Sequence, residues 1–434
     1  MTELSSAAQA AAAGTTGFKA PGTTPAKTPR GFTPTLAGVN FGVYLALLTP
    51  VLVSMAFKVQ HITPNPADIN GNIGLVFGVG ALFALFANPL AGRLSDRTTS
   101  RFGMRRPWVL GGAIVGLGGF LLIGVATSIW VVLAAWCLVQ TALNAMLAAA
   151  NATLPDQVPV AARGRVSGIV GITTPLGILA GSFVVNFLPG DVERFVVPGA
   201  IALVLAVLFV LVLRDRRLTE KPAQRFTVGQ FFGSFVFNPR KHRDFGWTWL
   251  TKFFVMFGYA GVATFLPRYL TESFHLAEQD VIGIILLSNL AATAAMVISS
   301  PLGGILSDRF GKRRPFVAIA GAIMVVGLLV LAFAPNTTTI IIGQAIIGLG
   351  AGSFFSVDLA LATQVLPNPE DTAKDLGVLN IANALPQSIA PAIAPLIIAA
   401  GSATALGGYT TWYLFGAVVA AAGAVLVYRI KGVK

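Results

Sequence analysis

Long runs of apolar residues recur along almost the whole chain, and this repetition restricts the possible folds more than any other feature. About 20 apolar residues are enough to cross the hydrocarbon core of a bilayer as a helix. Because hydrocarbon offers no partners to backbone N–H and C=O groups, runs of this kind are expected to be helical. Charged residues make up only 11% of the 434 residues, whereas a soluble domain carries about 25%. We therefore expect an all-α integral membrane protein.

The apolar runs predict twelve membrane-spanning helices. They cover residues 36–56, 71–94, 107–127, 129–154, 166–188, 195–213, 245–267, 281–306, 315–334, 338–365, 376–400 and 409–430. The predicted organisation is a disordered tail (1–35), an N-terminal six-helix bundle (36–213), a linker (214–244) and a C-terminal six-helix bundle (245–430). The tail is rich in small and polar residues, which is typical of disorder, and it lacks the basic start and apolar core of a signal peptide.

Basic residues predict the orientation of these helices. Of the 30 Lys and Arg residues, 26 fall in segments that share one side of the membrane if the N-terminus is inside. Cytoplasmic loops carry an excess of Lys and Arg, so we expect a multi-pass protein of the cell membrane with both termini in the cytoplasm. The net charge of +13 then reflects topology and contact with anionic lipid headgroups, and no nucleic-acid partner is expected.

The chain also contains an internal repeat. Residues 89–97 (PLAGRLSDR) return as 301–309 (PLGGILSDR), 212 residues later, and 154–156 (LPD) return as 366–368 (LPN) at the same offset. Two matches in one register predict two six-helix halves of the same orientation. A parallel repeat of this kind places a substrate site between the halves near the bilayer midplane and implies that one half rocks against the other.

These segments carry a family resemblance. The sequence GRLSDR at 92–97, the arginines that follow it up to 106, and the copy at 304–314 resemble the signature loop of the major facilitator superfamily. The sequences LPDQVP at 154–159 and RGRVSG at 163–168 are similar to the sugar:cation symporter branch, which includes glycoside-pentoside-hexuronide and sucrose-type carriers. The resemblance spans residues 36–430. It implies the superfamily fold (the MFS fold), a cavity lined by helices 1, 4, 7 and 10, and uptake of a saccharide with a proton or Na⁺.

Lys252 and Asp358 are ionisable residues within predicted spans, where a charge is costly and by default functional. Each lies about 10–12 Å from the predicted cytoplasmic end of its helix, so their depths match. A direct pair would offset much of the cost of burying either charge, although Lys252 could instead extend to the membrane interface. We expect Asp358 to take up and release a proton during transport, with Lys252 as the charge that competes with the proton.

Polar and aromatic residues on helices 1, 4, 7, 10 and 11 are the predicted cavity residues. Gln140, Asn144 and Asn151 have the spacing of one stripe on helix 4, and Trp136 lies one turn before Gln140, where it could stack on a sugar ring or pack in the core. The other candidates are Asn40 and Tyr44 on helix 1, Tyr259 on helix 7, Gln344 on helix 10, and Asn380, Asn383 and Gln387 on helix 11. Amides and hydroxyls suit a neutral polyol, and each also suits plain hydrogen bonding between helices.

The repeated cytoplasmic loop predicts a gate. In the superfamily the aspartate of this loop acts as a latch, and the matching residues here are Asp96 and Asp308. A carboxylate at this place can accept charge-assisted hydrogen bonds from arginines in one conformation only, which biases the alternating-access equilibrium. The predicted gate residues are Asp96, Arg97, Arg101, Arg106, Asp156, Arg163, Asp308 and Arg309, with Arg97, Arg101 and Arg106 as the partners of Asp96. The alternative is that these loops only set topology.

Several function classes are not expected. The sequence has no phosphate-binding Gly-Lys-Ser/Thr loop and no nucleophile with an adjacent His and acid, so neither ATP-driven transport nor an enzyme is predicted. One cysteine and three histidines supply no ligand cluster, so no metal or cofactor is expected. The expected partners are a small-molecule substrate, a coupling proton and the lipid bilayer, and we expect a monomer.

The leading interpretation is proton-coupled uptake of a sugar or similar polar solute by alternating access. A drug or metabolite exporter that works as a proton antiporter is the first alternative, but residues 171–177 (GITTPLG) depart from the Gly-Pro-rich fingerprint of helix 5 in such exporters. A non-transporting membrane sensor is the second alternative, and it would need a larger soluble domain than the linker at 214–244 provides.

Overall fold

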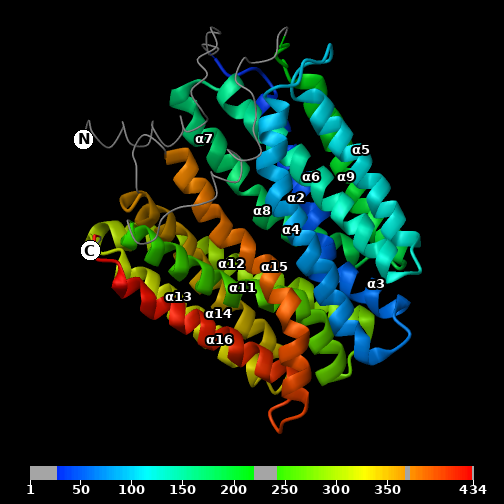
Figure 1. Cartoon of the computed structure of the whole chain (residues 1–434), viewed down its shortest axis with the longest axis vertical. Coiled ribbons are helices and arrows are strands. Elements are labelled where there is room, and N and C mark those ends of the chain that lie inside the picture. Colours follow the sequence, from blue (N-terminus) through cyan, green and yellow to red (C-terminus); the bar gives the residue numbers. More distant parts are fainter. Residues whose placement is uncertain (1–26, 219–241, 367–371, 433–434) are drawn as a thin grey trace. The chain divides into compact units, whose positions relative to one another are not determined.

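The structure, a computed structural model, describes residues 27–218, 242–366 and 372–432. Within these ranges every regular element is a helix, and twelve helical spans are long and apolar enough to cross a membrane (Figure 1). The predicted all-α fold with twelve spans is therefore confirmed. Residues 1–26 of the predicted tail and residues 219–241 of the predicted linker lie outside the described residues.

The helices follow the chain in twelve spans. Those of the first sequence half are α2 (Phe32–Thr49), η1 (Pro50–Ser54), α3 (Met55–Ile62), η2 (Pro66–Asp68), α4 (Ile69–Ser95), α5 (Arg106–Val125), α6 (Ile129–Gln157), α7 (Val160–Gly171), α8 (Thr173–Val185) and α9 (Asp191–Val212). Those of the second half are α11 (Arg243–Phe274), α12 (Glu278–Phe310), α13 (Arg314–Ala332), α14 (Thr337–Gln364), α15 (Thr372–Ser402), α16 (Gly408–Leu426) and η4 (Val427–Arg429).

Prolines explain the two interrupted spans. In the first span Pro50 opens the π-helical segment η1, because it has no N–H to donate to the carbonyl four residues earlier. In the fifth span α7 ends at Gly171 and α8 begins at Thr173, and Pro175 likewise leaves the carbonyl of Gly171 without its helical donor. The fifth span also begins earlier than the predicted residue 166, since α7 continues through Arg163 and Arg165, where the apolar run stops.

Other helices also extend beyond the apolar runs that predicted them. The first helix begins at Phe32, inside the predicted tail, and the helices predicted at 245–267 and 281–306 extend over Arg243–Phe274 and Glu278–Phe310. An apolar run marks the part of a helix that lies in hydrocarbon, whereas the helix itself continues into the polar layer. The added turns carry charged residues that matter for the sites described below.

The contacts group the chain into two compact units. Unit one comprises Met1–Pro50, Leu82–Gly233 and Glu370–Lys374, and unit two comprises Val51–Ala81, Ser234–Pro369 and Asp375–Lys434. The grouping departs from the predicted halves at residues 51–81, which belong to the first half of the sequence and to unit two by contact, and at residues 370–374, which belong to the second half and to unit one. The chain passes from unit one to unit two after Pro50 and returns to unit one at Leu82, inside α4. The first two spans therefore each contribute to both units. The predicted bundle limits, 36–213 and 245–430, stay a prediction.

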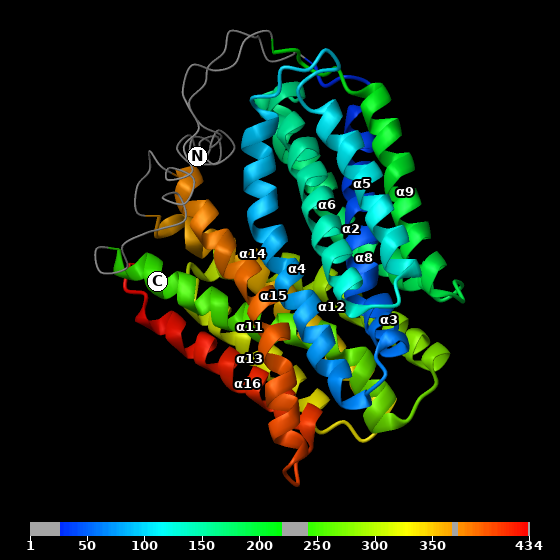
Figure 2. The same cartoon turned by 45° about the vertical axis from the view of Figure 1, so that its right-hand side comes forward.

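In unit one, α5 packs against α6 and α9, and α2 packs against α8 and α9 (Figure 2). Glycine permits the close approach of α5 to α6. A Cβ atom at Gly112 would lie 2.5 Å from the carbonyl oxygen of Ala142 and 2.8 Å from Cβ of Met146. The helices can therefore approach this closely only because the position has no side chain.

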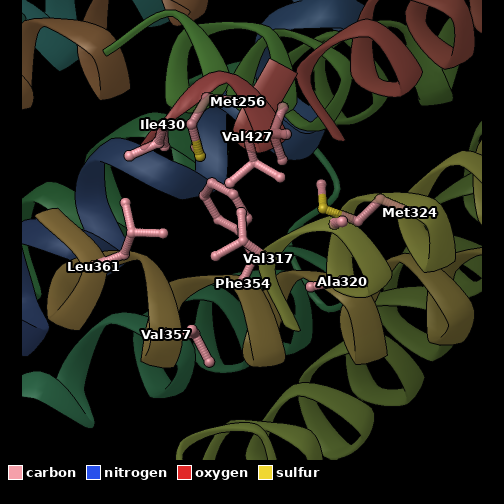
Figure 3. Packing of buried hydrophobic residues seen from close by; sticks show 11 residues of the cluster. Met256, Val317, Ala320, Met324, Phe354, Val357, Leu361, Val427 and Ile430 are labelled. Carbon is pink, nitrogen blue, oxygen red and sulfur yellow. The ribbon is translucent and has the colours of Figure 1, made fainter. Parts of the chain in front are cut away.

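In unit two, α14 packs against α12 and α13, and α16 packs against α11 and α13 (Figures 1 and 2). A buried apolar cluster forms between these helices (Figure 3). Its members are Val255, Met256, Val317, Ala318, Ala320, Met324, Phe354, Val357, Leu361, Val427 and Ile430. Three helices and the turn η4 thus share one core, which holds α11 and α14 at a fixed register.

Candidate functional site

Lys252 on α11 and Asp358 on α14 form an ion pair within unit two. Nζ of Lys252 lies 2.7 Å from Oδ2 of Asp358. Both residues are buried, with 7% and 3% of their surfaces exposed, respectively. The structure thus brings together the two residues whose matching depths suggested a pair, and we refer to them as the charge pair. Proton exchange at the charge pair stays a prediction.

The charge pair lies beside the apolar core of unit two. Val255, a member of the buried cluster, is three residues beyond Lys252 on α11. Two members that Figure 3 labels, Val357 and Leu361, lie one residue before and three residues after Asp358 on α14. Two charges in apolar surroundings depend on each other, because separating them would leave each one without water and without a counter-ion. Protonation of Asp358 would therefore leave the ammonium group of Lys252 in need of another acceptor.

Two further predicted cavity residues lie on the helices of the charge pair. Tyr259 is half-buried on α11, and its ring meets the ring of Phe355 on α14 edge-on, with centroids 6.0 Å apart. Gln344 on α14 is buried, with 8% of its surface exposed. Tyr259 therefore packs between α11 and α14 close to the charge pair in sequence, whereas Gln344 lies almost four turns before Asp358.

The predicted amides of helix 11 lie on α15, also in unit two. Asn380 and Gln387 are exposed and Asn383 is half-buried. Nε2 of Gln387 donates to the backbone carbonyl of Asn383, 3.2 Å away. Asn380 and Gln387 are therefore accessible at the protein surface, in contrast to the buried charge pair.

In unit one, the amides of helices 1 and 4 bond partly to one another. Nδ2 of Asn40 donates to Oδ1 of Asn151 at 3.0 Å and to the carbonyl of Leu36 at 2.9 Å. Nδ2 of Asn144 donates to the carbonyl and to Oε1 of Gln140, at 2.9 and 3.2 Å. Asn40 is fully buried, so its bond to α6 fits helix-to-helix hydrogen bonding, while Asn151 is exposed.

The aromatic candidates of unit one differ in exposure. Trp136 is fully buried, which favours core packing over stacking on a solute in this structure. Tyr44 is half-buried on α2, where a Cβ atom at Gly177 of α8 would lie 2.9 Å from Cβ of Tyr44. Tyr44 therefore sits at a close contact of α2 with α8, and the cavity roles of both aromatics stay predictions.

The loop after α4 contains the first half of the predicted gate. Arg105 donates to the hydroxyl of Ser95 and to Oδ1 of Asp96, and its guanidinium lies 3.8 Å from Oδ2 of Asp156 on α6. Arg105 is 5% exposed, so it ties the ends of α4 and α6 to the start of α5. We call Ser95, Asp96, Arg105 and Asp156 the first inner cluster.

Asp96 has a partner that the prediction did not name. Within the described part of the chain Asp96 pairs with Arg105, and two of the three arginines predicted for it make other contacts. The guanidinium of Arg106 donates to the carbonyl of Leu213 at the end of α9, 2.5 Å away, and that of Arg101 lies over the ring of Phe102. Arg106 is the first residue of α5, so its side chain leaves on the face that meets α9, whereas Arg105 precedes the helix and faces back toward Asp96.

The second half repeats the arrangement. Arg313 lies 2.5 Å from Oδ1 of Asp308 and 3.4 Å from the hydroxyl of Ser307, and Arg314 donates to the carbonyl of Lys431 at 2.7 Å. Arg309, the predicted gate residue, is exposed. In each half, the first arginine of Arg-Arg-Pro binds the Ser-Asp at the end of the second helix, and the second arginine binds a carbonyl just after the sixth. The Arg-Arg-Pro sequence occurs once in each half, and this repeat is the sequence signal that could have identified Arg105 and Arg313 as the partners of the two aspartates.

Two further gate candidates of the first half, Asp156 and Arg163, lie at or just after the end of α6. Nε and Nη2 of Arg163 donate to the carbonyls of Val158 and Pro155, at 3.1 and 2.9 Å. A cation at these carbonyls stabilises the C-terminal end of a helix. Arg163 therefore caps α6, while Asp156 joins the first inner cluster. Arg97, in the loop after α4, is half-buried.

Asp215, directly after α9, is a further residue that the sequence did not single out. Its Oδ2 accepts hydrogen bonds from the backbone N–H groups of Arg105 and Arg106, at 2.8 and 2.9 Å. The N–H of Met104 donates to the carbonyl of Arg216, 2.9 Å away. The start of the predicted linker thus binds the start of α5 and so supports the first inner cluster. The described residues contain no group of three or more His, Cys, Asp or Glu that could hold a metal ion.

Comparison with known proteins agrees with this architecture. The family model of the Major Facilitator Superfamily matches residues 32–298 and 248–433. The multidrug resistance protein MdtG of Salmonella typhimurium is 26% identical over 325 residues, which cover 73% of this chain and 75% of that protein. MdtG of Erwinia billingiae is 26% identical over 290 residues, or 64% of this chain and 65% of that protein.

Solved structures show the same fold. The nucleoside transporter NupG superposes with a TM-score of 0.70 at 12% identity, covering 92% of this chain and 99% of that chain. A bacterial homologue of the human lysosomal transporter Spinster gives a TM-score of 0.67 at 16% identity, covering 92% and 94%. The sugar symporter branch is not among these relatives. With a family model that matches both sequence halves, the chain belongs to the Major Facilitator Superfamily of membrane transporters.

Proposed function

We propose that this transporter takes up a sugar or similar polar solute together with a proton, by alternating access. The observation that carries the proposal is the charge pair, a buried carboxylate and ammonium 2.7 Å apart on two membrane-spanning helices. A titratable group inside a span is costly to keep and marks ion pathways in transporters. We assign proton exchange to Asp358 and competition with the proton to Lys252.

The chemistry of the pair links the proton to the solute. Protonation of Asp358 changes the net charge of the pair from zero to one positive charge, and it leaves the Lys252 ammonium with a neutral carboxyl group as a weaker acceptor. A hydroxyl or carbonyl oxygen of a bound solute can accept that hydrogen bond instead. Proton and solute then bind more favourably together than separately, and reciprocal coupling of this kind is what a symporter requires. When the proton leaves, the pair forms again and the solute loses its donor.

A proton-coupled multidrug exporter is the second candidate, and the similarity to the MdtG proteins favours it. The charge pair supports uptake of a neutral solute more strongly. A lipophilic cation needs an uncompensated acid, whereas Lys252 already neutralises Asp358 at a contact distance of 2.7 Å. Exposed amides on α15 likewise suit a solute that forms many hydrogen bonds.

Proteoliposomes with a pH-sensitive dye inside test the proposal. A panel of saccharides and a panel of cationic dyes are added outside, and solute flux and lumenal pH are recorded together. We expect a transported saccharide to acidify the lumen, and we expect Asp358→Asn to lose accumulation driven by a pH gradient while it keeps solute exchange. Asp280→Asn is the control, because Asp280 is an exposed acid in the first turn of α12.

Each other outcome contradicts the proposal. Full accumulation by Asp358→Asn means that the carboxylate does not carry the proton. Protons that move against the solute identify an antiporter, and dyes as the only substrates identify the exporter. If no solute of either panel crosses the membrane, the result favours a non-transporting membrane sensor.

A further inference from the structure

Five side chains form a continuous hydrogen-bonded network at the predicted outer end of unit two, and the proposed transport chemistry does not use them. Nη1 of Arg268 donates to Oε1 of Gln60 at 2.8 Å, and Nη2 of Arg268 donates to Glu272. The hydroxyl of Tyr409 donates to the other oxygen of Glu272 at 2.5 Å and accepts from Nδ2 of Asn70 at 3.2 Å. We call these residues the outer network.

The members of the outer network come from both halves of the sequence. Gln60 on α3 and Asn70 on α4 belong to the first half, although their contacts place them in unit two. Arg268 and Glu272 on α11 and Tyr409 on α16 belong to the second half. Two of the hydrogen bonds, Arg268 to Gln60 and Asn70 to Tyr409, therefore connect the halves that are predicted to rock against each other.

The outer network is built around two buried side chains. Arg268 and Tyr409 are 4% and 6% exposed, whereas Gln60 and Asn70 are half-buried and Glu272 is exposed. A buried guanidinium is tolerated only with a counter-ion and hydrogen bonds, and here Glu272 supplies the counter-ion one helical turn away. Because Arg268 and Glu272 share α11, the ion pair stays intact when the halves separate. Opening therefore breaks two hydrogen bonds and leaves no buried charge of this network unpaired.

One turn beyond Asn70, helix α4 of the network also meets α15 in a close contact, which we call the seam. A Cβ atom at Gly74 of α4 would lie 2.5 Å from the carbonyl oxygen of Pro391 on α15 and 2.7 Å from Cγ of Pro395. Pro395 has no N–H for the carbonyl four residues before it, so the carbonyl of Pro391 is free of its helical bond and faces the glycine. One turn on, a Cβ atom at Gly78 would lie 3.2 Å from the carbonyl oxygen of Ser388.

We propose that the outer network is a latch. It holds the outer ends of the first two spans on the second half, and it must break each time the outer side of the transporter opens. The latch proposal takes only one element from the proposed function, namely that the two halves rock against each other. Its neutral cross-links, Gln60 and Asn70, set how strongly the closed outer side is favoured, while the Arg268–Glu272 pair keeps the charge paired in both states.

A cysteine reporter tests the latch. The chain has one cysteine, so Cys137→Ser gives a background without thiols. Ser388 is 3% exposed, and its backbone carbonyl lies in the seam, so Ser388→Cys is a conservative reporter that is covered while the outer side is closed. The rate of labelling by a membrane-impermeant maleimide is measured in membrane vesicles of both orientations and without any solute.

Gln60→Leu and Tyr409→Phe each remove one cross-link while keeping nearly the same shape. We expect each to raise the labelling rate about five-fold from one side of the membrane only, the population shift that one net hydrogen bond supplies. The matched control is Asp280→Asn, which removes an exposed charge from the first turn of α12, outside the network, and it should leave the rate unchanged.

Native Cys137 distinguishes opening from unfolding. It is 8% exposed on α6 of unit one, so its labelling in the same variants without the reporter should stay at the wild-type rate. Unchanged labelling of the reporter in both Gln60→Leu and Tyr409→Phe overturns the latch, and so does an equal rise at Cys137. Because the assay needs no solute, a failed transport experiment leaves this result standing.

Discussion

At the scale of single residues, the charge pair makes a prediction about stability. Lys252→Gln and Asp358→Asn each leave one buried charge without a partner, and such a change typically costs about 3–5 kcal/mol. The double variant has two neutral side chains that can bond to each other, so it should cost clearly less than the sum of the single changes. Thermal unfolding in detergent measures the four proteins of the cycle. If the double variant is destabilised by the full sum of the two single changes, the two charges do not interact.

The charge pair and the first inner cluster show which residue contacts a sequence can reveal. Lys252 and Asp358 could be paired in advance because their depths follow from counting residues along straight helices. The partner of Asp96 could not, because Arg105 and Arg106 are neighbours and only the starting residue of α5 decides which one faces Asp96. The roles of the cavity amides could not be settled from the sequence either, since Asn40 is buried and bonds to Asn151, while Asn151 itself is exposed.

At the scale of helices, the start of α5 depends on a residue from another element. Asp215 accepts from the N–H groups of Arg105 and Arg106 and thus acts as a remote cap. Loss of a helix cap costs about 1 kcal/mol and up to about 2. We expect Asp215→Ala to destabilise the protein by that amount and to speed hydrogen exchange in the first turn of α5. Arg217→Ala is the control, since Arg217 is exposed two residues further on. Equal exchange rates in the two variants would refute the cap.

Helix α4 offers a second test with its own control. A methyl group at Gly74 would meet Pro391 and Pro395, whereas one at Gly71 would meet nothing within 4 Å. Alanine stabilises an open helical position by about 0.5–1 kcal/mol relative to glycine. We therefore expect Gly71→Ala to be neutral or stabilising and Gly74→Ala to push α4 off α15. The reporter Ser388→Cys should label faster in Gly74→Ala alone, and equal labelling in both variants would count against the seam.

The helix scale also shows where the sequence is least informative. Apolar runs predicted all twelve spans, because a span is defined by local composition. They did not predict that residues 51–81 group with the second half, because that grouping depends on contacts between distant segments, such as Gly74 with Pro391 and Asn70 with Tyr409. Arg268 was visible only as a basic residue outside the cytoplasmic set, and Glu272 four residues later was the sole sequence hint of its partner.

At the scale of the whole molecule, the repeat gives the transporter two copies of one inner arrangement, whereas both halves together form the outer network. Arg105 and Arg313 bind the Ser-Asp pairs of their own halves, while Arg106 and Arg314 bind carbonyls just beyond the sixth helices. The outer network, in contrast, has members from both halves. Contacts that hold the inner side closed and contacts that hold the outer side closed favour opposite states of the alternating-access equilibrium.

This opposition gives the last prediction. If Asp96 helps to hold the inner side closed, Arg105→Ala should favour the inward-open state and lower the outer labelling of Ser388→Cys, whereas Tyr409→Phe should raise it. The two clusters share no residue and belong to different units, so their effects should add as free energies. Two shifts of about equal size then cancel, and the double variant should label at nearly the wild-type rate. A double variant that labels like Tyr409→Phe alone would show that the inner cluster does not act on the equilibrium that the outer network controls.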